Sequence, residues 1–138
     1  MTGLTGLTGT LGIFVGGGLG ACARYFLSHT VSQQLAFSRI PLGTLAANAL
    51  GSLLIGFFFQ LFQSIAAPAY LRVAITVGFI GAFTTFSTYL LEIIQLIMRR
   101  QYVSAGASFL VQNVLGFVMV VAGVLLSDAL LKTMKGGL

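Results

Sequence analysis

Four long apolar stretches, separated by short connections, constrain the fold of this chain more than any other feature. They run over residues 11–27, 41–62, 71–97 and 103–126. A helix needs roughly 17–25 apolar residues to cross the hydrocarbon core of a bilayer. A helix also satisfies its own backbone in lipid, whereas four strands are too few to close a barrel. We therefore expect an all-α membrane protein with four transmembrane helices in one domain, residues 1–138.

The composition supports lipid as the solvent and argues against catalysis. Hydrophobic residues make up 57% of the chain and charged residues only 7%, whereas soluble domains carry about 25% charged residues. The titratable side chains suited to acid–base or metal chemistry are two distant acids, one histidine and one cysteine: Glu92, Asp128, His29 and Cys22. Because such chemistry usually needs several of these groups together, we expect that the protein is not an enzyme.

The basic residues do not indicate which side of the protein faces the cytoplasm. The side that would hold both termini and the second connection carries Arg72, Lys132 and Lys135. The opposite side carries Arg39, Arg99 and Arg100. Lys and Arg normally favour the cytoplasmic side, so this balance is compatible with insertion in both orientations. A single orientation fixed by other factors is equally compatible.

Glycines recur every fourth residue on the first span, at Gly12, Gly16 and Gly20. Small residues at this spacing form a flat helix face that lets another helix approach closely. The pattern predicts tight helix packing and carries no specific function.

Polar residues form a stripe on the second span and another on the fourth. Residues four apart lie on one face of a helix. The stripe on the second span consists of Thr44, Asn48, Ser52 and Gly56, and that on the fourth of Ser104, Ser108, Gln112 and Gly116. Two facing stripes can line a polar conduit, or they can join two helices by hydrogen bonds.

The third span has the most unusual sequence, GFIGAFTTFSTYLLE from Gly78 to Glu92. Glycine lowers the cost of leaving helical geometry, and Thr and Ser compete for backbone hydrogen bonds. We expect the helix to be broken around residues 81–85, where freed carbonyls suit a small cation. Phe86, Tyr89 and Glu92 follow at intervals of three. Aromatic edges can meet an anion, although simple packing is commoner, and an acid within a span is a functional candidate.

These segments resemble a known family. GFIGAFTTFSTYLLE closely resembles the signature of the CrcB/Fluc fluoride channels, and GGGLGACARY on the first span and PLGTLAANALGSLLIG on the second agree in order and spacing. The resemblance implies a passive fluoride channel in the bacterial plasma membrane that exports fluoride from the cytoplasm and lowers its toxicity. It also implies an antiparallel, dual-topology homodimer within membrane lipid.

The resemblance also assigns residues. It implies a structural sodium ion at the dimer centre, held by the backbone carbonyls of Gly81 and Thr84. The residues that match its ion pathway are Arg24, Asn48, Phe86, Ser87, Thr88, Tyr89, Glu92, Ser108 and Gln112. Two positions depart from the family pattern: Tyr89 stands where Phe is usual, and Gln112 follows Ser108 where the family often continues a hydroxyl track.

Two other functions remain open from the residues alone. A small four-helix, proton-coupled exporter of the multidrug type would need a membrane-embedded acid, for which Glu92 is the candidate within a span. A structural membrane subunit would use the glycines and polar stripes only for packing.

Overall fold

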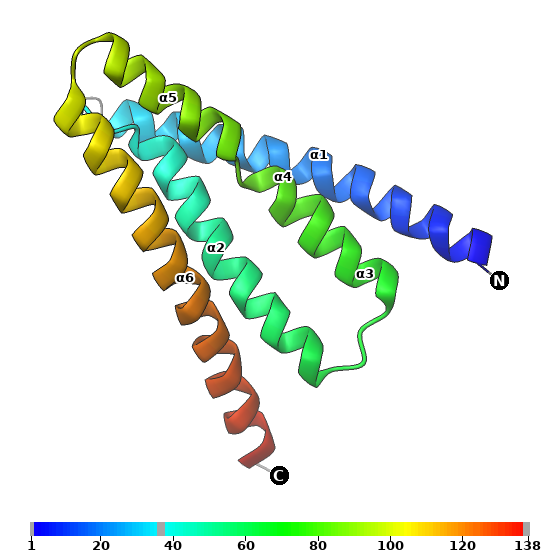
Figure 1. The fold of residues 1–138 in the computed structure, drawn as a ribbon. Helices are drawn as coiled ribbons and strands as arrows, with labels where there is room; N and C mark the ends of the chain where they lie inside the picture. Colours follow the sequence, from blue (N-terminus) through cyan, green and yellow to red (C-terminus); the bar gives the residue numbers. More distant parts are fainter. Residues whose placement is uncertain (1, 36–37, 137–138) are drawn as a thin grey trace.

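A computed structural model describes residues 2–35 and 38–136, and all regular structure within these ranges is helical (Figure 1). The elements are α1 Thr2–Gln34, α2 Leu42–Ser64, α3 Ala69–Val73, the π-helix η1 Ala74–Ile80, α4 Gly81–Phe83, α5 Phe86–Met98 and α6 Tyr102–Gly136. Four helical units in the described ranges are long and apolar enough to cross a membrane: Gly6–Gln34, Leu42–Ser64, Ala69–Met98 and Tyr102–Met134. The predicted all-α fold with four spans is therefore confirmed at this level.

The helices extend beyond the apolar stretches that predict them. The first span continues through Ser28 and His29 to Gln34, where the sequence suggested a connection. Tyr102–Gly136 contains 35 residues, which corresponds to about 50 Å of helix against a core of about 30 Å. Hydropathy marks the part of a helix that lies in hydrocarbon, and a helix is free to continue into the interface.

The helices pack mainly as two pairs. α2 lies along α6, and α1 lies along the segment formed by α3, η1 and α4 (Figure 1). α5 packs on α6, so the third span contacts α1 with its first part and α6 with its last part. The two pairs are joined through contacts of α2 with α1 and η1.

Glycines are located where these helices meet most closely. A Cβ added at Gly16 would lie 2.5 Å from the carbonyl oxygen of Ala74, and one at Gly20 would overlap the backbone of Phe79. The predicted close approach at the first-span glycines is therefore confirmed, and its partner is η1. Gly56 on α2 approaches the Val120 backbone of α6 in the same way.

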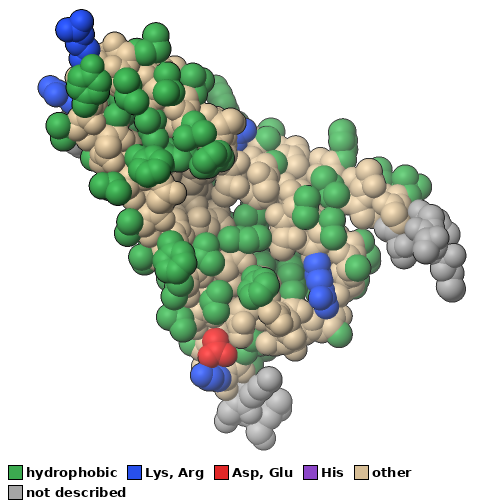
Figure 2. Space-filling view, viewed as in Figure 1, with side chains coloured by type: hydrophobic (Ala, Val, Ile, Leu, Met, Phe, Trp, Pro, Cys, Tyr) green, Lys and Arg blue, Asp and Glu red, His purple; other side chains and the backbone are tan. Residues whose placement is uncertain are grey.

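The outer surface is apolar along the length of the bundle. Hydrophobic side chains are spread over the face shown in Figure 2, where few charged side chains are seen. Phe14 is 79% exposed and Val103 is 88% exposed. A soluble monomer rarely exposes large contiguous apolar patches, so this surface fits contact with lipid or another membrane helix.

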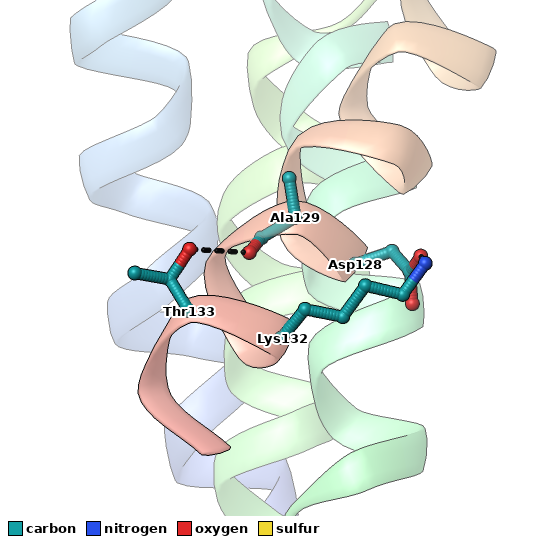
Figure 3. Close-up of polar contacts among 4 residues, drawn as sticks. All are labelled: Asp128, Ala129, Lys132 and Thr133. Carbon is teal, nitrogen blue, oxygen red and sulfur yellow. Dashed lines mark hydrogen bonds and ion pairs between the residues drawn. The ribbon is translucent and has the colours of Figure 1, made fainter. Parts of the chain in front are cut away.

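The end of α6 carries the ion pair of the described chain. Lys132 Nζ lies 2.8 Å from Asp128 Oδ2, and one turn of helix separates them (Figure 3). Thr133 Oγ1 donates to the Ala129 carbonyl beside this pair (Figure 3). Charged side chains are expensive in hydrocarbon, so this pair marks the end of α6 that faces water.

The third span leaves helical geometry over two residues. Thr84 has φ −92° and ψ 157°, and Thr85 has φ −150° and ψ 123°, both extended. Gly81 remains helical at φ −61° and ψ −37°, so the change is narrower than the predicted interval, residues 81–85. The helix resumes at Phe86. The span is thus bent at Thr84 and Thr85 and helical on both sides of these two residues.

Candidate functional site

The extended residues of the third span are held by a side chain of α2. Asn48 Nδ2 donates to the Thr85 carbonyl at 2.9 Å, and the Thr85 N–H donates to Asn48 Oδ1 at 2.8 Å. The Asn48 amide thus bonds both backbone groups of one residue, Thr85. Unpaired backbone groups are strongly disfavoured in a membrane, so Asn48 stabilises the interruption. The hydrogen bonding between helices that was considered for the polar stripe is found here. Asn48 bonds the backbone of Thr85 and also the side chain of Gln112.

The carbonyls at the end of α4 lose their usual helical donors. In an α-helix the carbonyl of Gly81 would accept from the N–H of Thr85, which instead donates to Asn48. The next carbonyl, Ala82, accepts from Arg24 Nε of α1 at 3.1 Å. A cation at this position also complements the negative end of a helix. Arg24 therefore links α1 to the end of α4 through a hydrogen bond, in addition to any effect of its positive charge.

Hydroxyl groups gather where α5 begins. Thr85 caps the helix, since its Oγ1 accepts from the Thr88 N–H at 3.3 Å and donates to Thr88 Oγ1 at 3.0 Å. Ser87 is exposed, and its Oγ lies 3.5 Å from the same Thr85 oxygen. These groups lie at the positive end of a helix, which favours negative charge nearby.

Two hollows lie on either side of the interruption, and Thr85 contributes to both. One is a groove of about 350 Å³ whose lining includes Asn48, Gly81, Thr84 and Phe86 and carries no charged side chain. The other, of about 370 Å³, is lined by residues of α1, α2 and α5. Its polar lining consists of Arg24, Tyr25, Ser28, His29, Ser32, Thr44, Thr85, Thr88 and Glu92. Thr85 therefore borders both an uncharged groove and a hollow with charged groups, and Asn48 lines the groove.

Glu92 is half-buried in the second hollow. Thr44 Oγ1 donates to Glu92 Oε1 at 2.6 Å, which links α2 to α5. Glu92 Oε2 is buried and has no hydrogen-bond partner among the described residues.

The two aromatic side chains of the predicted pathway lie together but differ in exposure. The ring centroids of Phe86 and Tyr89 are 5.7 Å apart with a tilt of 57°. Phe86 is 68% exposed, whereas Tyr89 is 3% exposed and packs among Ile93, Leu96 and Ala105. Phe86 is therefore the ring that an ion or a second subunit could contact directly.

The polar stripes of α2 and α6 face one another. Asn48 Nδ2 lies 3.4 Å from Gln112 Oε1, and Ser52 lies opposite Gly116. Ser108 and Gln112 are buried, and neither Ser108 Oγ nor Gln112 Nε2 has a partner within the described residues. The stripes therefore join the helices at one point and leave hydrogen-bond donors unused beside it.

Sequence reasoning missed three partners in this region. It did not select Thr44 as the donor to Glu92, although Thr44 belongs to the polar stripe of α2. It did not identify the Ala82 carbonyl as the partner of Arg24, which no sequence pattern indicates. It also left Asn113 aside, whose amide Nδ2 donates to the Tyr89 hydroxyl at 2.9 Å.

The fold and site define a multi-pass membrane protein with polar groups gathered at an interruption of a transmembrane helix. Residues 11–124 match the family described as CrcB-like protein, Camphor Resistance (CrcB). The chain belongs to this family, which confirms the resemblance in the sequence.

The relatives of this chain include proteins named fluoride-specific ion channel FluC. The relative from Hydrogenobaculum sp. is 40% identical over 114 residues, which are 82% of this chain and 92% of the relative. That from Desulforapulum autotrophicum is 41% identical over 115 residues, 83% of this chain and 91% of the relative. That from Nitratiruptor sp. is 38% identical over 124 residues, 90% of this chain and 92% of the relative.

Proposed function

We propose that this protein is a channel that passes fluoride passively out of the bacterial cytoplasm and so lowers its toxicity. The family supports this function, because relatives that match most of the chain are named fluoride-specific ion channels. The names of these relatives also favour an ion channel over an enzyme. The role of each residue below is part of the proposal.

The observation that carries the proposal is a pair of unused donors on α6. Ser108 Oγ and Gln112 Nε2 are buried and without a partner in the described chain. A buried polar group left without a partner costs about 1–3 kcal/mol. Such groups are retained where a ligand or water meets them, and these two lie one helical turn apart, with Gln112 Oε1 3.4 Å from Asn48 Nδ2. An anion that passes here would accept hydrogen bonds from both.

The chemistry of the site suits fluoride. A small, strongly hydrated anion needs donors that replace its lost water, and binding must stay weak enough for exit. Hydroxyls, amides and aromatic edges are such donors. The groove beside Asn48 has no charged lining residue, and Arg24 contributes to the second hollow. We assign Thr88, Ser87, Phe86, Tyr89 and Glu92 to the same path.

The end of α4 fits a structural sodium ion. The Gly81 carbonyl has lost its helical donor to Asn48, and Thr84 is extended. Backbone carbonyls of an interrupted helix are ligands for sodium in membrane proteins. We propose that the Gly81 and Thr84 carbonyls hold the ion, which would supply positive charge that satisfies these oxygens.

Two carbonyls from one chain leave a cation with few ligands, so we propose that a second copy completes the site. Gly81 and Phe86 are both exposed in the single chain, at the place where a partner would have to approach. The balanced loop charges are compatible with an antiparallel, dual-topology homodimer. In that assembly the interrupted third spans of the two subunits meet at the centre.

The family and the names of the relatives favour the channel over the multidrug-type exporter. Glu92 is the acid that such a carrier would need, and it accepts a hydrogen bond from Thr44. Transport of an organic cation driven by a proton gradient, lost in Glu92→Gln, would support that function over ours.

The test is fluoride efflux from liposomes that contain the purified protein, followed with a fluoride electrode. We expect efflux of fluoride and little efflux of chloride. Ser108→Ala combined with Gln112→Leu should slow fluoride efflux several-fold, while the matched control Ser104→Ala, one turn earlier, should not. No fluoride efflux from folded wild-type protein would refute the proposed function.

A further inference from the structure

The hydroxyl of Tyr89 is held by two groups of α6. Asn113 Nδ2 donates to Tyr89 Oη at 2.9 Å and also to the Phe109 carbonyl at 2.7 Å. Tyr89 Oη in turn donates to the same carbonyl at 3.4 Å. The three residues form a closed set of hydrogen bonds between α5 and α6.

This set fixes the Tyr89 ring at its polar end. The phenol donates a long hydrogen bond to the Phe109 carbonyl and accepts a shorter one from Asn113, so both partners of its oxygen belong to α6. The ring also stacks on Phe109, with centroids 6.4 Å apart and an angle of 25°. Its other neighbour is the exposed ring of Phe86, at 5.7 Å. The position of Tyr89 therefore determines the surface against which Phe86 rests.

Asn113 is not required by the core of the subunit. It is exposed on the outer side of α6, where a polar side chain is expensive in hydrocarbon. Both hydrogens of its amide are directed at the Tyr89 set. Asn113 is therefore unfavourable at its own exposed position, and its amide bonds the Tyr89 set. Its effect on the protein is then exerted through the Tyr89 ring.

We propose that Asn113 is a positioning residue for the permeating anion: it fixes Tyr89, and through Tyr89 the orientation of Phe86 at the uncharged groove. This inference rests on the proposed fluoride channel. It assigns the Tyr89 hydroxyl a role in orienting the ring and leaves contact with the anion to ring edges.

A double-mutant cycle on fluoride efflux tests this assignment. Asn113→Leu leaves the buried phenol with one weak partner, so we expect several-fold slower efflux and a lower fluoride-over-chloride ratio. Tyr89→Phe removes the hydroxyl that this set holds, so the ring loses the same support and efflux should slow to a similar extent. Because both substitutions break the same hydrogen bond, the double variant should be no slower than the slower single variant. Val114→Leu, exposed on the same helix, controls for the added leucine.

Two outcomes with an active wild-type channel overturn the inference alone. One is wild-type efflux in Asn113→Leu, and the other is a double variant in which the two losses multiply, as they do for residues that act independently. Asn113→Ala replaces the leucine variant if that does not fold. Tyrosine labelled with ¹³C at Cζ gives a readout without flux. The resonance missing in Tyr89→Phe should shift in Asn113→Leu, and an unmoved resonance also overturns the inference. A wild-type protein that passes no fluoride refutes the proposed function itself.

Discussion

The side-chain amide of Asn48 and the backbone peptide of Thr85 form two reciprocal hydrogen bonds, at 2.9 and 2.8 Å, between the second and third spans. This pair lets Thr85 adopt extended geometry within a membrane span while its own N–H and carbonyl are bonded. It also takes the helical donor from the Gly81 carbonyl, and Thr85 borders both hollows. One side chain thus connects the fold of the third span to the proposed ion path.

Loss of this pair should destabilise the protein and abolish its transport. Asn48→Ala leaves the N–H and the carbonyl of Thr85 without their partner, and we expect a loss of about 1–3 kcal/mol in the free energy of unfolding. Fluoride efflux should fall strongly. Ser52→Ala, one turn along the same stripe, is the control and should keep both. Unfolding in a detergent titration and liposome efflux measure the two effects, and wild-type values for Asn48→Ala would contradict the assigned role.

The hydrogen bond from Thr44 to Glu92, in the second hollow, should contribute to both stability and fluoride efflux. Thr44→Val keeps the shape of the side chain and removes the donor to Oε1, so neither oxygen of the Glu92 carboxyl group then has a partner in the described chain. We expect a loss of about 1–3 kcal/mol in stability and slower fluoride efflux. Thr44→Ser retains the hydroxyl and should restore both. If valine and serine behave alike, the hydrogen bond has no role.

The close approach of α1 to η1 should make Gly20 intolerant of a methyl group. Gly20→Ala would place its Cβ against the backbone of Phe79, whereas a Cβ at Gly18 meets nothing within 4 Å. Overpacking a tight contact costs about 1–3 kcal/mol. We expect Gly20→Ala to lower the midpoint of thermal unfolding and Gly18→Ala to leave it unchanged. Equal midpoints would show that these helices are not in close contact in the membrane.

Removal of sodium should weaken the proposed dimer. Replacing sodium by N-methyl-D-glucamine leaves the Gly81 and Thr84 carbonyls without their cation, so the dimer fraction in size-exclusion chromatography should decrease. Thr84→Val is the control, because the Thr84 hydroxyl donates to the Ile80 carbonyl at 3.1 Å and is not a proposed ligand. That variant should keep the same dependence on sodium. A dimer equally stable without sodium would contradict the site.

The number of spans and the glycine contacts could be predicted because they depend on local patterns. Apolar length predicts a span, and Gly16 and Gly20 predict a close neighbour on their own helix face. The identity of that neighbour, η1, could not be predicted, since a flat face accepts any helix. Helix ends were also missed, because a helix such as Tyr102–Gly136 continues beyond its most apolar part.

The site was predictable as a set of residue types and not as a set of contacts. Asn48 and the Thr/Ser-rich segment of the third span stand out because polar groups are rare in membrane helices. The pairing of Asn48 with Thr85 depends on residues 37 positions apart, and so does the exact location of the extended residues. The roles of Asn113 and Arg24 likewise depend on partners that only the folded chain brings together.

The most direct test of the central claim is whether fluoride moves as a free ion down its own gradient. Liposomes with purified protein and internal potassium fluoride should release fluoride only when valinomycin lets potassium follow, because a passive channel carries net charge. Fluoride release in the presence of valinomycin should not require a proton gradient. Rapid fluoride release that depends on valinomycin supports the account, and release that is indifferent to valinomycin but driven by protons would contradict it.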